Sequence, residues 1–469
     1  MGTKALQLFD AKHILKKTPQ LGEIPGNAEI LRKTFQVAWP SMLESFMMAL
    51  VSMVDTIMVS SLGPSAIAAI GLTNQPKFIC LAVFMSMSVA VSALVARRRG
   101  EGDRDGANKV LIQSLLIVLL LNFVITLLAL AFADPILRFT GTNADTHELA
   151  MQYYQIVVGC QLFNAINTII NAAQRGAGNT KIAMWTNLVS NGVNVVFNYL
   201  LIQGKMGFPA LGVRGAAIAT VLGTLAAMLM ALRSISHPQG YLFLWRGRKF
   251  MRFDRKTLGS LVDIGSSTLA DQVFLRIGFM LYVMIVAHLG TNAFAAHQIG
   301  MNILTMSFAM GDGLSVAAIA LVGQSLGQNR PDLAKIYGGF CQRVGMVCSL
   351  VLAVVYFLLN DQIFRLFSDD PEILVYGPMM MFFVVIIVLF QIAQVIYSGC
   401  LKGGGDTRFV ALVSLLSVSI MRPMAGWLFV YPLNMGLMGA WIGLTMDQGM
   451  RMLLTFIRFK SDKWLKIKI

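Results

Sequence analysis

Charged side chains are scarce in this sequence: Asp, Glu, Lys and Arg make up 13% of its 469 residues, and hydrophobic residues make up 56%. A soluble protein of this length could not keep its surface solvated with so few charges, so a soluble globular fold is excluded. The five cysteines lack metal-like spacing and predict neither a metal site nor a disulfide framework. The sequence contains no phosphate-binding loop, zinc-protease motif or nucleophile elbow, so we expect no enzyme and no cofactor.

Long apolar runs are present instead, and the mean hydropathy is +0.67. About 20 apolar residues are enough for a helix to cross ~30 Å of hydrocarbon. We therefore predict an all-α integral membrane protein with twelve transmembrane helices, six in each half. The expected spans are 36–60, 70–96, 109–133, 149–173, 182–203, 213–234, 260–288, 298–325, 335–359, 374–400, 409–431 and 437–457.

The positive charges indicate the orientation. Most of the 38 Lys and Arg residues lie in the N-terminal segment, the loops after even-numbered spans and the C-terminal tail. The positive-inside bias places these segments, and both termini, in the cytoplasm. Each half has an even number of spans, so the two halves enter the membrane from the same side as parallel repeats. The net charge of +15 is then mainly a topology signal, and no nucleic-acid partner is expected.

The expected organisation follows from these spans. Residues 1–35 contain no apolar core of a signal peptide and are read as a cytoplasmic segment, which could include a short amphipathic helix on the membrane. The remaining parts are a six-helix lobe at 36–234, a basic cytoplasmic linker at 235–257, a second six-helix lobe at 258–459 and a cytoplasmic tail at 460–469.

The two halves repeat each other with an offset of 227 residues. Leu62 and Gly63 recur as Leu289 and Gly290, and the glycine-containing run from Arg175 recurs from Lys402. Internal repeats of this kind are typical of transporters that alternate access around a site between the repeats.

Asp55 is the most informative polar residue inside an expected span. Acids at membrane depth mark an interior or a water-filled pathway. One interpretation is a carboxylate that binds a proton or Na⁺, and the alternative is an acid that only fixes helix packing. Glu44 lies three helical turns earlier on the same face, and its repeat mate is Asp271. For these two acids, a structural role at the entrance of each lobe competes with direct coupling.

Amides mark three further spans. Four asparagines at helical spacing form one stripe on the fifth span, which the offset of 227 does not reproduce at Ser414, Val418, Met421 and Ala425. The fourth span and its mate, the tenth, both keep a polar face. Such stripes face the bundle interior or a cavity, either as walls of a shared substrate cavity or as packing contacts. These residues are Asn187, Asn191, Asn194 and Asn198 on the fifth span, Asn164, Asn167 and Asn171 on the fourth, and Gln391, Gln394 and Ser398 on the tenth.

Two buried acids in the second half complete the set. Asp312 and Asp447 lie inside expected spans, and Arg451 follows Asp447 at i+4. We expect Asp447 and Arg451 to pair on one helix face.

Several segments together resemble the multidrug and toxic compound extrusion (MATE) family, over essentially the whole chain. Each motif alone is weak, but their joint occurrence is specific. They are Pro40 to Glu44, Val54 to Gly63, Gln174 to Thr180, Gly215 to Thr220, Ala295 to Ile299, Val322 to Gly327 and Gly399 to Thr407.

The resemblance implies two six-helix lobes arranged as a V and export of cationic amphipathic compounds, driven by inward Na⁺ or H⁺. Asp55 matches the cation-binding acid of the first span, and Asn194 matches an asparagine of the DinF-like branch. Asn198 stands where that branch usually has Asp. The acids of the NorM-like branch are replaced by Leu275 and Gln391, so the chain looks closer to the DinF-like branch, with coupling in the first lobe.

The leading hypothesis is therefore a cation-coupled exporter in the cell (plasma or inner) membrane, acting as a monomer on small-molecule substrates. A flippase for a lipid-linked substrate is the first alternative. A non-transporting scaffold or receptor is the second, and the duplication argues against it, since a scaffold needs no symmetric cavity.

Overall fold

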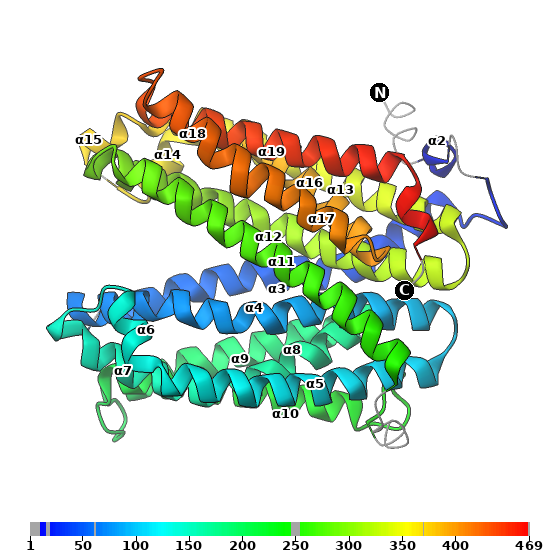
Figure 1. Ribbon diagram of the computed structural model, residues 1–469, viewed down its shortest axis with the longest axis horizontal. Coiled ribbons are helices and arrows are strands. Elements are labelled where there is room, and N and C mark those ends of the chain that lie inside the picture. Colours follow the sequence, from blue (N-terminus) through cyan, green and yellow to red (C-terminus); the bar gives the residue numbers. More distant parts are fainter. Residues whose placement is uncertain (1–9, 16–18, 61, 245–253, 369, 468–469) are drawn as a thin grey trace. The chain divides into compact units, whose positions relative to one another are not determined.

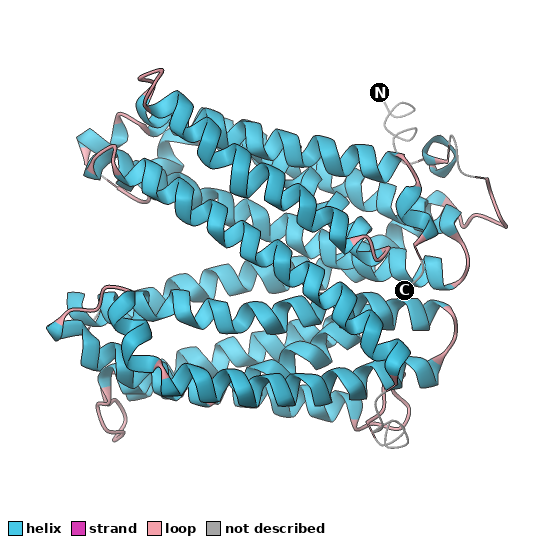
Figure 2. Cartoon of the chain, in the orientation of Figure 1, coloured by secondary structure: helices cyan, strands magenta, loops and turns pink. Residues whose placement is uncertain are grey.

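The computed structural model describes the whole chain apart from residues 1–9, 16–18, 61, 245–253, 369 and 468–469. The described residues form helices and connecting loops, and no strand occurs among them (Figure 2). The helices are α2 (Ala11–Ile14), α3 (Asn27–Ser60), α4 (Pro64–Gly100), α5 (Arg104–Ala131), α6 (Ala133–Phe139), α7 (Ala144–Gly159), α8 (Gln161–Gly176), α9 (Thr180–Leu201), α10 (Gly212–Ile235), α11 (Arg255–Ala287), α12 (Thr291–Gly327), α13 (Pro331–Leu358), α14 (Asn360–Arg365), α15 (Pro371–Leu374), α16 (Gly377–Gly403), α17 (Thr407–Ser414), α18 (Arg422–Val430) and α19 (Gly436–Lys460) (Figure 1). A π-helix, η2 (Leu415–Met421), joins α17 to α18, and a 3₁₀ turn, η3 (Lys463–Lys466), follows α19.

These helices account for the twelve expected spans. Eight described helices are long and apolar enough to cross a membrane, and the pair α7–α8, bent by 46°, makes a ninth. The helices α3, α9 and α19 contain 34, 22 and 25 residues and also have the required length. Asparagines in α9, and Asp447 and Arg451 in α19, lower the hydropathy of two of these helices. The predicted all-α membrane fold is confirmed.

The chain forms two compact units, one comprising residues 1–45 and 266–469 and the other residues 46–265. We call them the C-terminal unit and the N-terminal unit. The boundaries between the units, at 45/46 and 265/266, fall within α3 and α11. The expected lobes begin at residues 36 and 258, which lie earlier in the same two helices. Residues 245–253 of the expected basic linker lie outside the described residues.

The helix pairings of one unit recur in the other, as duplication predicts. In the N-terminal unit α4 packs against α5 and α8, and α9 packs against α10. In the C-terminal unit α12 packs against α13 and α16, and α18 packs against α19. Figure 1 shows the corresponding helices within each unit.

Two pairs of glycines at equivalent positions show how closely the backbones of the two repeats agree. Gly63 and Gly290 precede α4 and α12 with φ of 94° and 103°, a backbone region that residues with a Cβ rarely adopt. Gly176 of α8 and Gly403 of α16 lie where the helices cross. A Cβ at Gly176 would meet the carbonyl oxygen of Ser92 at 2.4 Å, and one at Gly403 would meet that of Ile319 at 2.7 Å. Both pairs differ by the same 227 residues, so the close crossing is inherited by both halves.

The described part of the N-terminal segment belongs to the C-terminal unit. In this segment α2 forms only a single helical turn. The described residues before α3 contain no amphipathic helix of greater length. The Leu21 backbone N–H donates to the Asp332 carboxylate at 3.2 Å, and Arg330 donates to the Glu23 carbonyl at 3.0 Å. The segment is thereby tied to the loop between α12 and α13.

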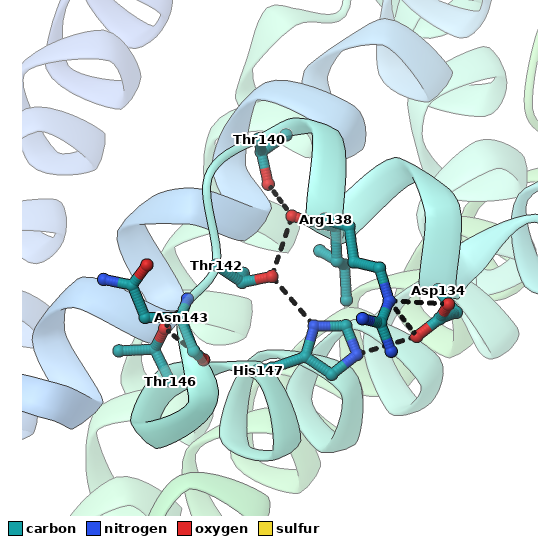
Figure 3. Close-up of polar contacts among 8 residues, drawn as sticks. Asp134, Arg138, Thr140, Thr142, Asn143, Thr146 and His147 are labelled. Atoms are coloured by element: carbon teal, nitrogen blue, oxygen red, sulfur yellow. Dashed lines mark hydrogen bonds and ion pairs between the residues drawn. The ribbon is translucent and has the colours of Figure 1, made fainter.

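A polar network fixes the turn between α6 and α7 (Figure 3). Asp134 forms an ion pair with Arg138 at 2.9 Å, and its other oxygen lies 2.9 Å from His147 Nε2. On the opposite side of the ring, His147 Nδ1 lies 2.8 Å from the Thr142 hydroxyl, which donates to the Leu137 carbonyl. The hydrogen bond from Arg138 is the main cause that lowers the pKa of Asp134 below its usual value. Because the side chains of Asp134 and Arg138 are half exposed or more, the network orders the turn and contributes little to global stability.

The crossings at Gly176 and Gly403 yield a testable expectation. Gly176→Ala and Gly403→Ala should each destabilise the protein by roughly 1–3 kcal/mol, because a backbone carbonyl occupies the space of the new methyl group. Gly192→Ala is the control, since a Cβ there meets nothing within 4 Å and alanine favours a helix. Melting temperatures of the purified variants in detergent would measure the effect. Equal melting temperatures for all three variants would contradict the close crossing.

Candidate functional site

Asp55 lies among neutral amides in the N-terminal unit. Asn198 Nδ2 donates to Asp55 Oδ1 at 2.8 Å and also lies 3.2 Å from Asn194 Oδ1. Asn194 Nδ2 lies 3.3 Å from the Thr220 hydroxyl. With the Asn194 amide turned over, its Nδ2 donates to Asp55 Oδ1 at 2.7 Å, and its oxygen accepts from the Thr220 backbone N–H at 3.2 Å. That orientation satisfies both ends of the amide, so both asparagines donate to one carboxylate.

Five helices supply this site. Asp55 comes from α3, the two asparagines from one face of α9 and Thr220 from α10, which packs against α9. From α4, Lys77 interacts electrostatically with Asp55, and its ammonium lies 5.8 Å from the centre of the Tyr153 ring on α7. Tyr153 in turn hydrogen bonds the Thr220 side chain. We call Asp55, Lys77, Tyr153, Asn194, Asn198 and Thr220 the Asp55 cluster.

The sequence identified half of this cluster. The prediction named Asp55, Asn194 and Asn198, and the structure brings these three residues together. It did not place Lys77, Tyr153 or Thr220 at the site. A usable signal existed for Lys77, because it is the one Lys or Arg more than two residues from the ends of an expected span of the first half. Tyr153 and Thr220 carry no such signal, since both residue types are common in membrane helices.

The amides expected along a substrate cavity divide into two groups. Asn171 Nδ2 donates to Asn167 Oδ1 at 3.0 Å and to the Thr186 hydroxyl at 2.9 Å, and Asn167 lies 3.4 Å from Asn187. This ladder links α8 to α9 within one unit, which favours the packing interpretation for these residues. The other two, Asn164 and Asn191, are only half-buried. The Asn191 Nδ2 has no hydrogen-bond partner among the described residues.

Asp271 is occupied by partners of its own unit. Lys402 forms an ion pair with one carboxylate oxygen at 2.9 Å, and the Ser414 hydroxyl donates to the other at 2.5 Å. Its repeat mate Glu44 is buried, with 8% of its surface exposed. A carboxylate that is already neutralised by a lysine favours a structural role for Asp271 over a coupling role.

The polar residues of α16 lie in the interior of the C-terminal unit or at its edge. Gln391 and Gln394 are buried in the C-terminal unit, with 8% and 5% of their surfaces exposed, and Ser398 is half-buried. The Gln391 Oε1 has no hydrogen-bond partner among the described residues. A buried amide with a free acceptor is open to a further donor.

The C-terminal unit contains a buried triad of charges. Arg422 donates to Asp447 Oδ2 through Nε at 3.0 Å and Nη2 at 2.5 Å, and Arg451 donates to the same oxygen at 3.1 Å. The pairing of Asp447 with Arg451 is thus confirmed. The side chains of Arg422 and Asp447 are fully buried, and the guanidinium of Arg422 lies 5.7 Å from the Tyr282 ring centre. Aromatic rings help to hold such a cation in a dry interior.

One residue of this triad, Arg422, is the repeat mate of a residue of the Asp55 cluster. A Cβ at Gly215 would meet the Leu201 carbonyl oxygen at 2.5 Å, and one at Gly439 would meet that of Phe429 at 2.7 Å. Leu201 and Phe429 differ by 228 residues, one more than the offset, because the π-helix η2 accommodates an extra residue. The mate of Asn194 is therefore Arg422, and the expected mate Met421 is wrong by one position. Asp55 corresponds to Tyr282, so an Asp–Asn contact became a Tyr–Arg contact.

Comparison with known families assigns the chain. The MatE family model matches it twice, over residues 40–200 and 268–428, once in each half of the duplication. The chain therefore belongs to the MatE family, a family of transporters. Five of the six residues of the Asp55 cluster lie within the first match, and Thr220 on α10 lies beyond its end.

Similar proteins are known over nearly the whole length. The chain is 27% identical over 457 residues to a probable multidrug resistance protein NorM of Thermotoga maritima, covering 95% of this chain and 94% of that protein. It is 25% identical over 441 residues to the multidrug resistance protein MdtK of Yersinia pestis, covering 93% and 95%. The fold is similar to that of a MATE family transporter of the MOP superfamily in an outward-facing conformation, with a TM-score of 0.84, 21% identity and coverage of 94% and 100%.

The triad yields a prediction on stability. Asp447→Asn should destabilise the protein by about 3–5 kcal/mol, because two buried arginines lose the charge that compensates them. Asp361→Asn is the matched control: its ion pair with Arg365 is exposed and should contribute less than about 1 kcal/mol. Thermal unfolding followed by size-exclusion chromatography would compare them. A similar melting temperature for both variants would show that the triad does not stabilise the C-terminal unit.

Proposed function

We propose that this protein is a cation-coupled antiporter that exports cationic amphipathic compounds across the cell membrane by alternating access. Membership of a transporter family and relatives named as multidrug resistance proteins support this class of substrate. The Asp55 cluster supports the coupling. Neither a cofactor nor a second subunit is needed for this activity, so we propose a monomer driven by Na⁺ or H⁺.

The observation that carries the proposal is a carboxylate inside a membrane span whose hydrogen-bond partners are neutral amides. An acid at this depth costs a few kcal/mol on insertion scales, so its retention indicates a function. Amides stabilise the charged carboxylate without neutralising it permanently. The group can therefore gain and lose a cation as its access to the two sides of the membrane changes.

The position of the Asp55 cluster also helps to choose between the two branches of the family and between an exporter and a flippase. The polar site lies in the N-terminal unit, and Leu275 and Gln391 stand where acids occur in the NorM-like branch, so we place the chain nearer the DinF-like branch. A flippase for a lipid-linked phosphate would need free cations. Arg422 and Arg451 are both engaged by Asp447, and the exporter is therefore the better supported function.

We further propose that Glu44, Asp271, Asn187, Asn191 and the polar residues of α8 and α16 serve the transport cycle in roles other than coupling. Paired residues, such as Asp271 and the Asn167–Asn171 ladder, would keep helices in register. Half-buried residues, such as Asn164, Asn191 and Ser398, are better placed to meet a substrate.

The role of Asp55 can be tested directly. Asp55→Asn should insert and fold normally but lose gradient-driven export, because an amide cannot be charged and discharged. Efflux of a fluorescent lipophilic cation from cells that express equal amounts of each variant measures this. Asp134→Asn, an exposed acid of the same unit, is the control and should export normally. Normal ion-dependent efflux by Asp55→Asn would move the coupling role elsewhere.

The proposed orientation has its own test. In a version without native cysteines, single cysteines in the loop at 101–103 should react only with reagents that enter the cytoplasm. A cysteine at Thr142, in the turn between α6 and α7, should react from outside. Labelling of the 101–103 loop by an impermeant reagent would contradict both the orientation and the cytoplasmic termini.

A further inference from the structure

Lys77 introduces a positive charge into the Asp55 cluster that the proposed function does not use. It lies on α4 directly after Pro76, at a point where proline removes a backbone hydrogen bond of the helix. Its side chain is half-buried, and its ammonium approaches the Tyr153 ring while interacting electrostatically with Asp55. One carboxylate and one ammonium give the cluster a net charge of zero before any coupling ion binds.

The groups that face Asp55 are mainly hydrogen-bond donors. Asn198 Nδ2 donates to the carboxylate, and Asn194 Nδ2 does so in the orientation that satisfies its amide. Lys77 adds an ammonium from α4. Tyr153 from α7 is the other titratable group at the cluster, and α9 and α10 contribute only amides and a hydroxyl among the described residues.

We propose, on the basis of the function proposed above, that the coupling ion is the proton, carried by Asp55, and that Lys77 is the positioning residue that disfavours Na⁺. A hard cation such as Na⁺ requires several oxygen ligands around it, whereas N–H donors directed at the carboxylate occupy the positions those ligands would need. An ammonium nearby repels a bound metal cation, and this repulsion is strong where water is excluded.

A proton has no such requirement. It binds to one carboxylate oxygen, and a neighbouring amide can turn its own oxygen towards the new O–H group. Protonation removes the negative charge of Asp55, so its electrostatic attraction to the Lys77 ammonium is lost. Loading a proton thus weakens the attraction between α3 and α4 within the N-terminal unit, next to the turn that Pro76 leaves without a backbone bond.

The test uses the full-length protein in proteoliposomes with ethidium as the transported cation. A pH gradient should drive wild-type transport, and a Na⁺ gradient of equal size at matched pH should drive it at less than one tenth of that rate. Lys77→Gln should allow Na⁺ to bind at least tenfold more tightly, measured as Na⁺-induced thermal stabilisation. Lys77→Arg keeps the charge and should retain the wild-type preference.

Lys205→Gln is the matched control. Lys205 is a lysine of the same unit whose ammonium also lies over an aromatic ring, 4.2 Å from the centre of Tyr199. Its side chain is exposed, and it is not part of the Asp55 cluster. Its removal should leave the ion preference unchanged. Wild-type transport driven by Na⁺, or the same Na⁺ response in Lys77→Gln as in wild type, would overturn the proposal.

The outcomes separate the two proposals. If Na⁺ drives ethidium export, the exporter stands and the proton assignment fails. If neither gradient moves ethidium, the proposed export of such cations fails. Na⁺-induced stabilisation of wild type and Lys77→Gln then still decides whether Lys77 keeps Na⁺ from Asp55.

Discussion

The contact between a membrane-embedded carboxylate and two neutral amides is the interaction on which the rest of the N-terminal unit depends. Asn194 and Asn198 donate hydrogen bonds to Asp55 without supplying a charge of their own. This arrangement needs α3, α9 and α10 in fixed register. The amide ladder between Asn167, Asn171 and Thr186 joins α8 to α9 about two to three helical turns before the two asparagines on α9.

The two halves share the same helix crossings but enclose different charged groups. The crossings at Gly176 and Gly403 are nearly identical, so the helical frames of the repeats agree. Inside those frames, the N-terminal unit holds an acid among amides, and the C-terminal unit holds Arg422 and Arg451 on Asp447. In the triad both arginines donate to one carboxylate oxygen, whereas in the Asp55 cluster the hydrogen-bond partners of the carboxylate are amides. The two halves thus share a helical frame and differ in the charged groups that they enclose.

The fold was predictable from the sequence because hydrocarbon allows few solutions. Runs of about 20 apolar residues define the helices, and the repeat defines their grouping. Three of the six residues of the Asp55 cluster were also predictable, since Asp55 and the asparagines at helical spacing are costly in a membrane unless they meet each other. Lys77, Tyr153 and Thr220 join the site through the way α4, α7 and α10 pack against α3 and α9, and no spacing in the sequence encodes that contact. The counterpart of Asn194 was displaced by one residue for a similar reason, because η2 changes the helical register without leaving a recognisable gap.

The π-helix η2 also bears on how the two halves could be exchanged by engineering. A segment transplanted from Thr180–Leu201 into the place of residues 407–429 would have the right length to within one residue. It would nevertheless present an asparagine where Asp447 now meets Arg422, and every side chain beyond the junction would point about 100° away from its present direction. The single added residue makes the halves non-interchangeable parts, although their backbones descend from one template.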